Sequence, residues 1–236
     1  MALHVLSAGA AKALLRRVAQ DSGIDMLAEF GAVGAMRERL DSGAPCDVIV
    51  LTQTMIAELA AAGIVAADSV VSLGCVRTGV AVPTGASGAV EADVASAASL
   101  KALLSAASQI YFPDPVRSTA GIHFMKVLTT LGLAQSHSDR FATFPNGATA
   151  MRAMADAGDP RAVGVTQCSE ILYTDGVQLI GALPGEFELA TVYSAAMVQR
   201  SFGANDADHA RVFLAALSTP DGEALRHELG FEPTNE

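Results

Sequence analysis

Along this chain, short apolar runs of strand length alternate with longer segments in which apolar residues recur with the period of a helix. Short apolar runs of strand length occur at Leu3–Leu6, Met26–Phe30 and Asp47–Leu51, and each precedes a segment whose apolar residues recur every three to four positions. The first of these segments, Ala10–Gln20, is predicted as a helix. The apolar block of the third run contains no polar residue, which is typical of a parallel strand covered on both faces.

The same alternation continues to the end of the chain. It predicts further strands at Val70–Val82, Ile110–Phe112, Ala162–Val165, Val177–Leu179 and Leu189–Val198. It predicts further helices at Gly34–Leu40, Met55–Ala62, from an N-cap at Ser99 to Ala107, and at Thr119–Leu131, Ala148–Ala157, Ala207–Leu217 and Asp221–Glu228. Small residues from Pro83 to Ala98 predict a surface connection. Alternating strands and helices indicate the α/β class with mostly parallel sheets.

Two strand-like runs, Val76–Val82 and Leu189–Met197, enclose a middle segment that has βα units of its own. This arrangement predicts two lobes joined by two crossovers. We expect lobe 1 to contain residues 1–77 and 193–236, and lobe 2 to be an insertion of residues 78–192. A ligand cleft is expected between the two lobes.

The net charge and the lengths of the apolar runs limit the kinds of partner that this chain can bind. The chain has 236 residues and a formal net charge of −10, so its long-range field repels the backbone of DNA or RNA. No apolar run approaches the roughly 18 residues of a membrane helix, so direct membrane insertion is not expected. A small anion remains a possible ligand, because the N–H groups and dipole at a helix N-terminus favour negative charge locally.

The sequence gives no sign of a metal, a cofactor or a disulfide framework. The cysteines Cys46, Cys75 and Cys168 have no zinc-ligand spacing and are expected to be thiols. No P-loop, dinucleotide fingerprint, HExxH or GxSxG motif occurs. The segment from Met1 enters a strand without a signal peptide, so we expect a periplasmic protein if a signal was removed and a cytoplasmic one if Met1 is the native start.

Four segments carry a resemblance to a known family. They are LHVLSAGAAKALL, EFGAVGAMRERLDSGAPCDVIVLT, PDPVRSTAGIHFMKVL, and VGVTQCSEIL followed by ALPGE. In order and spacing they resemble type II periplasmic binding proteins, specifically the molybdate-binding-protein-like family of ABC transporter substrate-binding proteins. The resemblance spans nearly the whole chain and implies a two-lobed α/β fold that captures a small anion.

The chain departs from that family where molybdate is held. The resemblance places ligand contacts at the first turn, with Ser7, Gly9 and Ala10, and at the second helix, with Val33 and Gly34. Molybdate binders carry hydroxyl side chains at these turns, but the second turn here has none. Gln167 falls near the position of a tyrosine that caps the anion in those binders. Because each missing donor costs about 1–3 kcal/mol, an organic carboxylate is favoured over molybdate.

The sequence Arg117-Ser118-Thr119 joins a predicted strand to a predicted helix. Ser118 or Thr119 can cap the helix, and Arg117 can bind a carboxylate through two N–H groups. The competing interpretation is an ordinary N-cap beside a solvated arginine. Asn146 precedes the next helix and is a further candidate ligand contact, with a simple turn as its alternative.

The residues after the strand at Ala162–Val165 lie where ligands of open α/β sheets bind. Gln167 and Ser169 could bind a carboxyl or amide oxygen there. Glu170 could act as a base, or it could be an acid in the first turn of a helix that favours the helix dipole. Cys168 has no histidine nearby in sequence to activate it. His123, on the helix after Thr119, is expected to be a packed or surface residue unless it serves as a base.

Two functions remain open. The first is a solute-binding protein that captures a small anion and presents it to the membrane component of an ABC transporter or to a sensor. The second is a cytoplasmic, cofactor-independent isomerase of a small unsaturated polycarboxylate, because relatives with this fold are known as aconitate isomerases. The isomerase would need Glu170 or His123 as a base, with Arg117 and helix N-termini stabilising the developing negative charge.

Overall fold

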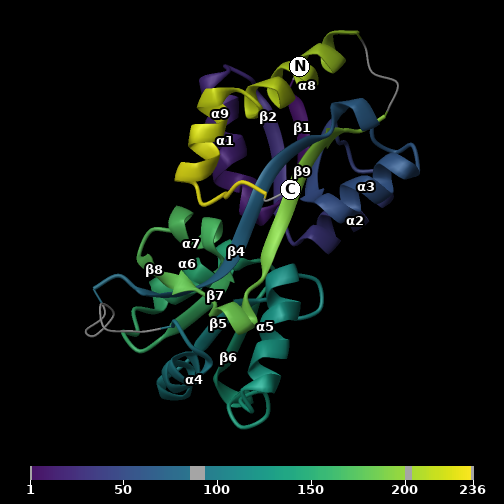
Figure 1. The fold of residues 1–236 in the computed structure, drawn as a ribbon. Helices are drawn as coiled ribbons and strands as arrows, with labels where there is room; N and C mark the ends of the chain where they lie inside the picture. The colour runs from purple at the N-terminus through teal and green to yellow at the C-terminus, as the bar shows by residue number, and fades with distance from the viewer. Residues whose placement is uncertain (1, 86–93, 200–203, 235–236) are drawn as a thin grey trace. The chain divides into compact units, whose positions relative to one another are not determined.

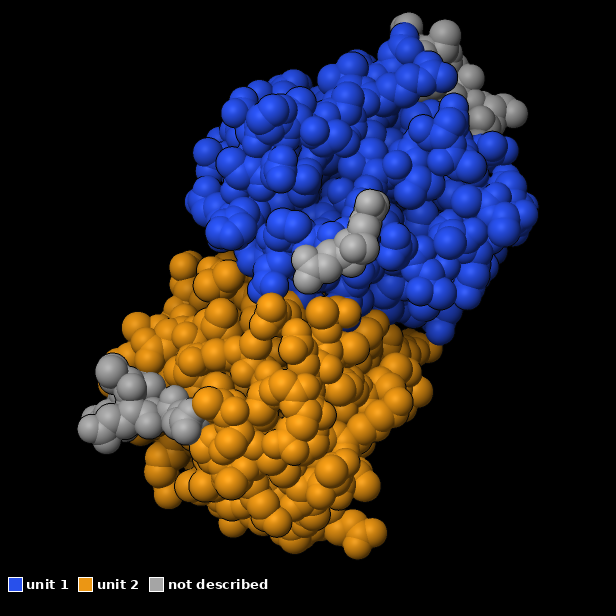
Figure 2. All heavy atoms as spheres, in the orientation of Figure 1, with its two compact units in different colours: residues 1–76, 191–236 blue, residues 77–190 orange. Residues whose placement is uncertain are grey.

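The computed structural model describes residues 2–85, 94–199 and 204–234. The chain forms two compact units, unit 1 with residues 1–76 and 191–236 and unit 2 with residues 77–190 (Figure 2). Strands alternate with helices in both units, so the predicted α/β class is confirmed. Two long strands, β4 (Val71–Pro83) and β9 (Ala190–Met197), each contain a point where the chain passes from one unit to the other.

Unit 1 contains a mixed sheet with the order β2-β1-β3-β9. Its first three strands are β1 (Leu3–Ala8), β2 (Met26–Gly31) and β3 (Val48–Thr52). β1 is parallel to both β2 and β3, whereas β9 is antiparallel to β3. Leu3, Val5 and Leu6 of β1 and every residue of Val48–Leu51 are buried, because this sheet is covered on both faces.

Helices cover the two faces of this sheet (Figure 1). The short 3₁₀ helix η1 (Gly9–Ala11) leads into α1 (Lys12–Asp21), which packs with the C-terminal helices α8 (Ala204–Leu217) and α9 (Pro220–Glu228). On the other side lie α2 (Val33–Asp41), which contacts β1 and β3, and α3 (Gln53–Ala61), which contacts β3. A further 3₁₀ helix, η2 (Ala67–Ser69), precedes β4.

Unit 2 contains a second mixed sheet. Its strands are β5 (Ile110–Pro113), β6 (Phe141–Phe144), β7 (Val163–Gln167) and β8 (Val177–Ala182), together with the second half of β4. β5 is parallel to β6 and β7, and β4 is antiparallel to β7 and β8. Its helices are α4 (Ala97–Ala106), α5 (Thr119–Thr130), α6 (Gly147–Ala157) and α7 (Cys168–Tyr173), with the 3₁₀ turns η4 (Ser138–Arg140) and η5 (Gly185–Phe187).

Alternate residues of the unit 2 strands contribute to two different cores. Ile110 and Phe112 of β5 belong to the core shared with α4 and α5, whereas Tyr111 belongs to the core shared with α6 and α7. Successive side chains of a strand point to opposite faces, so one short strand can anchor helices on both. The Phe112 ring contacts Phe124 of α5 edge to face, at 5.3 Å between ring centroids. α5 is therefore held firmly beside the end of β5.

Most predicted elements are found within a few residues of their expected bounds, but helix α7 was not among the predicted helices, and two further differences occur. β6 was not predicted, because four half-exposed residues are too short a run to show a period. Ser99 was predicted as the N-cap of α4, and this is wrong. Ser96 is the N-cap and exchanges hydrogen bonds with Ser99, so the helix begins earlier. Part of the predicted connection at 83–98, residues 86–93, lies outside the described residues.

The sequence predicted two lobes that close on a ligand, with residues 1–77 and 193–236 in one and residues 78–192 in the other. This closure stays a prediction. The two compact units divide the chain close to those boundaries, at residues 76/77 and 190/191. The sheets are mixed, because β4 and β9 add antiparallel pairs to the parallel strands.

Gly121 sets how closely α5 approaches the end of β5. A Cβ atom at this position would collide with the backbone carbonyl oxygens of Pro113 and Asp114, which cannot rotate away. We expect Gly121→Ala to lower the free energy of unfolding by about 1–3 kcal/mol, measured by urea denaturation. Gly185→Ala is the matched control, because nothing lies within 4 Å of its Cβ position. Equal stability of the two variants would contradict this packing.

Candidate functional site

The carboxyl ends of three parallel strands meet at one edge of the unit 1 sheet. Ser7 near the end of β1 lies opposite Phe30 of β2 and Val50 of β3, so the three strands end at a similar level. The helical segment that starts with η1, helix α2 and helix α3 all begin at this edge. The edge therefore collects the predicted contacts of the first two turns, which are Ser7, Gly9, Ala10, Val33 and Gly34.

Two of the three helical segments that start at this edge of unit 1 have no side-chain cap. The N-cap positions of η1 and α2 are Ala8 and Ala32, which cannot accept a hydrogen bond through a side chain. α3 differs, because the Thr52 hydroxyl accepts a hydrogen bond from the Met55 N–H at 3.4 Å. The first N–H groups of a helix need partners from outside the helix, so η1 and α2 offer donors that an anion can use.

Ser7 contributes less than its position suggests. Its side chain is fully buried at 0% exposure, and its hydroxyl donates a hydrogen bond to the Ala8 carbonyl at 2.9 Å. The hydroxyl proton is thus directed to the backbone, so the Ser7 side chain offers no donor to a ligand at this edge.

A corresponding edge exists in unit 2, where β5, β6 and β7 end together. Pro113 lies opposite Phe144, and α5, α6 and α7 begin after these strands. Ser118 is at the N-cap position of α5 but its side chain forms no capping hydrogen bond. The turn before it is held instead by the Asp114 carboxylate, which accepts hydrogen bonds from the N–H groups of Val116 and Arg117 at 2.7 and 3.1 Å. Thr119 is the first residue of α5.

The start of α6 is already occupied by side chains of the protein. The side-chain oxygen Oδ1 of Asn146 accepts hydrogen bonds from the Thr149 N–H and from the Thr149 hydroxyl, both at 2.9 Å. The Glu170 carboxylate accepts one from the Ala148 N–H at 3.3 Å and one from the Thr166 hydroxyl at 2.6 Å. Gly147 is required there, because a Cβ atom would overlap Thr166 and Glu170.

Glu170 lies in the first turn of α7, but its carboxylate caps the neighbouring helix α6. The side chain is only 6% exposed. Burial raises the pKa of this carboxyl group, and hydrogen bonds from Thr166 and from backbone N–H groups oppose that rise in part. Glu170 is thus an acid in the first turn of a helix, as one interpretation of the sequence has it, but its carboxylate also caps α6. Its oxygens are used to hold the start of α6.

The other predicted residues of unit 2 are placed as follows. Gln167 is buried at the N-cap position of α7, without a capping hydrogen bond from its side chain. Ser169 is buried, and its hydroxyl has no hydrogen-bond partner among the described residues. His123 of α5 has its Nε2 atom 2.8 Å from the Phe187 carbonyl oxygen, which ties η5 to α5. The catalytic roles predicted for Glu170 and His123 stay predictions.

Acidic residues are absent from the first turns of most helices at these edges; α7, with Glu170 in its first turn, is the exception. None occurs in the first turn of α1, α2 or α3 in unit 1, nor of α5 or α6 in unit 2. Away from these edges, α9 follows the more usual pattern and begins with Asp221 and Glu223. A chain with 25 acidic residues thus leaves these helix starts without acids, although acids there would stabilise the helices. The pattern favours a negatively charged ligand.

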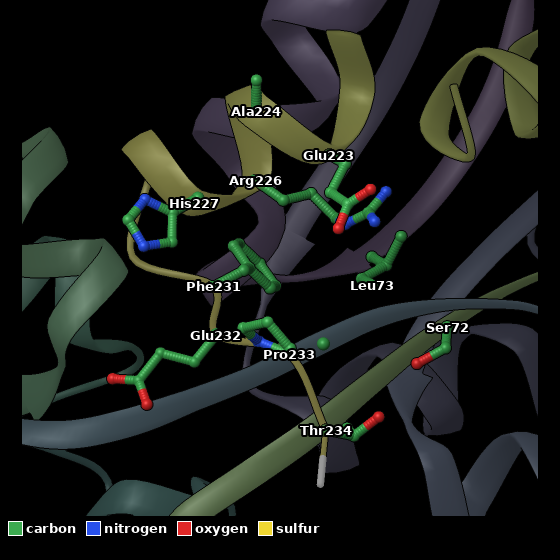
Figure 3. A pocket seen from close by; sticks show the side chains of 11 residues that line it. Ser72, Leu73, Glu223, Ala224, Arg226, His227, Phe231, Glu232, Pro233 and Thr234 are labelled. Carbon is green, nitrogen blue, oxygen red and sulfur yellow. The ribbon is translucent and has the colours of Figure 1, made fainter. Parts of the chain in front are cut away.

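A pocket of about 570 Å³ lies elsewhere in unit 1 (Figure 3). Its walls are the start of β4, helix α9 and the C-terminal segment, and Phe231, Arg226 and Glu223 are among the residues that line it. None of the predicted ligand contacts lines it. It has both charge signs on partly exposed side chains, so the strand edges remain the better candidate for anion binding.

Some features of the unit 1 edge were missed from the sequence. The Lys12 amine lies 6.0 Å from the centre of the Phe30 ring, and the Arg16 guanidinium carbon lies 5.6 Å from it. A Lys and an Arg four residues apart on a predicted helix were the available signal. Within the described residues we find no cluster of three potential metal ligands, and no helix has the length and apolar character of a membrane crossing.

The chain was compared with protein families and with known proteins. Residues 3–232 match the model of a family described as bacterial extracellular solute-binding protein. An aconitate isomerase of a Pseudomonas species is 27% identical over 241 residues, covering 98% of this chain and 87% of that protein.

Solved structures show the same fold. The periplasmic molybdate-binding protein of Azotobacter vinelandii has a TM-score of 0.75 at 18% identity, with 99% of this chain and 100% of that chain covered. A sulfate-binding protein of Mycobacterium tuberculosis has a TM-score of 0.67 at 16% identity, with 100% and 88% covered. At these identities the likeness shows the fold alone, which is that of periplasmic binding proteins.

The buried Glu170 predicts a change of stability with pH. Its pKa is raised in the folded state, so the folded protein binds this proton more tightly than the unfolded chain does. The associated stability is fully present below the ordinary glutamate pKa of about 4.3 and is lost as pH rises through the raised value. We expect the difference in unfolding free energy, Glu170→Gln minus wild type, to increase with pH across this window.

Urea denaturation at several pH values measures this difference. Glu58→Gln on α3 is the matched control, because Glu58 is exposed. If Glu170→Gln and Glu58→Gln show the same pH dependence, then Glu170 does not carry the shifted proton.

Proposed function

Because the chain belongs to the bacterial extracellular solute-binding protein family, we propose that it binds a small organic anion with carboxylate groups at the carboxyl edges of its parallel strands. The observation that carries this proposal is the set of helix starts at these edges that lack acidic residues, including η1, α2 and α5, which no side chain caps. Backbone N–H groups at such starts bind anions without a cationic side chain. The overall charge of −10 is overcome by these local donors.

The donor set supports a carboxylate more than molybdate. The second turn of unit 1 consists of Ala32, Val33 and Gly34, which offer N–H groups but no hydroxyl. A tetrahedral dianion has four oxygens to satisfy, and each oxygen left without a donor in a dry site costs about 1–3 kcal/mol. A carboxylate has two oxygens, and Arg117 at the start of α5 can pair with one such group. The 27% identity to an aconitate isomerase also supports a polycarboxylate ligand.

The family describes extracellular proteins, which supports an exported protein that delivers its ligand to the membrane component of an ABC transporter. Such a protein needs binding and release but no catalytic group. Ser7, Gly9, Ala10, Val33 and Gly34 are then the unit 1 contacts, and Arg117, Ser118, Thr119, Gln167 and Ser169 are the unit 2 contacts. Asn146 supports the start of α6 and is a weaker candidate, because its side-chain oxygen is used by Thr149.

An acidic N-cap on α2 should change ligand affinity and the free energy of unfolding in opposite directions. Ala32 has the extended backbone of an N-cap, so Ala32→Asp should cap α2 and raise the free energy of unfolding by about 1 kcal/mol. The same carboxylate occupies the N–H groups proposed for the ligand. We expect at least a tenfold loss of affinity in calorimetric titrations with aconitate, fumarate, molybdate and sulfate, for whichever of these the wild type binds.

Thr219→Asp is the control, because it adds a carboxylate at the N-cap of α9, away from the edge. Its affinity should equal that of the wild type. Undiminished binding by a folded Ala32→Asp variant would rule out the α2 start as a ligand contact. Binding of molybdate or sulfate alone would overturn the carboxylate assignment and keep the anion site.

Isomerisation of a small unsaturated polycarboxylate is the second candidate function, and the 98% coverage of this chain by the aconitate isomerase alignment favours it. Proton NMR of the protein with cis-aconitate in deuterated buffer tests it. An isomerase would form the trans isomer and exchange a carbon-bound proton for deuterium, and His123→Gln and Glu170→Gln would identify the base. Because the oxygens of Glu170 hold α6, we expect binding without turnover.

A further inference from the structure

Two buried hydroxyl groups of unit 2 have no hydrogen-bond partner among the described residues. They are Oγ1 of Thr78 and Oγ of Ser169, in residues that are 1% and 3% exposed. A buried hydroxyl without a partner costs free energy, because it has lost its hydrogen bonds to water and gained none from the protein. Such groups are uncommon in native proteins, so their place in the fold requires an explanation.

Thr78 lies at the carboxyl edge of the unit 2 sheet, although it is far in sequence from the other proposed contacts. β4 runs antiparallel to β7, so the residues with which β4 enters unit 2 lie beside the residues with which β7 ends. Thr78 pairs directly with Gln167, the last residue of β7. Ser169 follows Gln167 by two residues, in α7. Both residues with an unpaired hydroxyl therefore lie at the end of β7.

The side chain of Thr78 is on the face of the sheet that α5 covers. Successive side chains of a strand alternate between the two faces, so Thr78 shares its face with Val80. Val80 belongs to the core that contains Phe124 and Val127 of α5. α5 begins at this edge, and Ser118 at its N-cap position forms no side-chain capping hydrogen bond. Thr78 therefore shares both its face and its edge with a helix start that no side chain caps.

Backbone contacts hold Thr78 in this position. Its N–H donates a hydrogen bond to the Leu189 carbonyl, and its own carbonyl accepts one from the Leu183 N–H, both at 2.9 Å. The next residue, Gly79, is confined as well, because a Cβ atom there would lie 2.6 Å from Sγ of Cys168. A shift of β4 that brought the Thr78 hydroxyl to a partner within the protein would disturb these contacts. An anion bound at the start of α5 would supply the missing partner instead.

We infer that Thr78 is a further ligand-binding residue of unit 2, whose hydroxyl donates a hydrogen bond to an oxygen of the bound anion. This role rests on the proposed function, in which Ser118 and Thr119 at the start of α5 contact that anion. Ser169 is then the second hydroxyl donor at the end of β7. Unit 2 thus differs from the unit 1 edge, where the Ser7 hydroxyl donates to a backbone carbonyl.

Thr78→Val separates a ligand contact from a structural role, because it removes the hydroxyl and keeps the shape of the side chain. Without ligand, the variant loses a buried hydroxyl that has no partner, so we expect its midpoint in urea denaturation to rise. Calorimetric titrations with aconitate, fumarate, molybdate and sulfate should show about a tenfold loss of affinity for whichever of these the wild type binds. Thr78→Ser keeps a hydroxyl and should retain the wild-type affinity within about threefold.

Thr174→Val is the matched control, because Thr174 is also buried in unit 2 and its hydroxyl donates to the Glu170 carbonyl at 2.8 Å. This variant should lower the urea midpoint and leave every affinity within about twofold of the wild type. A lower midpoint for Thr78→Val would show that its hydroxyl has a partner within the protein. Unchanged affinity of that variant would show that the ligand does not use the hydroxyl. Either result would overturn the role of Thr78.

The same titrations distinguish this role from the proposed function. If Ala32→Asp weakens binding and Thr78→Val does not, the proposed function stands and the role of Thr78 is overturned. A wild-type protein that binds none of the four anions would overturn both.

Discussion

The first N–H groups of a helix have no hydrogen-bond partner inside that helix. The need to supply partners from elsewhere explains much of how each unit is built. Parallel strands bring several helix starts to one edge of a sheet, so many N–H groups without a partner inside their helix lie together there. The helix starts of this chain are of three kinds. Thr52 and Asn146 cap with their own side chains, Glu170 caps α6 from a neighbouring helix, and the starts of η1, α2 and α5 keep no side-chain cap. Starts of the last kind can serve a ligand.

Glu170 shows how one carboxyl group can change which helix starts are available. Its position in α7 suggests an exposed first-turn acid, yet it is buried against Gly147 and Thr166. The absent Cβ at Gly147 makes room for this contact, and the contact removes the start of α6 from the donors available to an anion. The cost of burying the carboxyl group appears as its raised pKa. One buried side chain thus stabilises a helix start and also determines which N–H groups there are already used.

Small residues at the unit 1 edge are consistent with the same interpretation. Gly9, Ala10, Ala32 and Gly34 expose backbone donors without adding side-chain volume. The acids that elsewhere favour helix starts are missing here, although the chain is strongly acidic. Lys12 and Arg16 add positive charge to the edge, supported by the Phe30 ring. The proposed anion site rests on these backbone donors.

The sequence by itself determined the α/β class, nearly all of the helices and strands, and the residues that follow each parallel strand, because periods of two and 3.6 are local properties. It missed β6 and α7, whose four and six residues are too short to show a period. It placed the α4 cap at Ser99, because two serines three residues apart are equally suitable by sequence. Only the tertiary structure decided that Glu170 caps α6, that the Ser7 hydroxyl faces the Ala8 carbonyl, and that Lys12 reaches Phe30. These contacts join different elements or depend on a side-chain rotamer, so no local pattern encodes them.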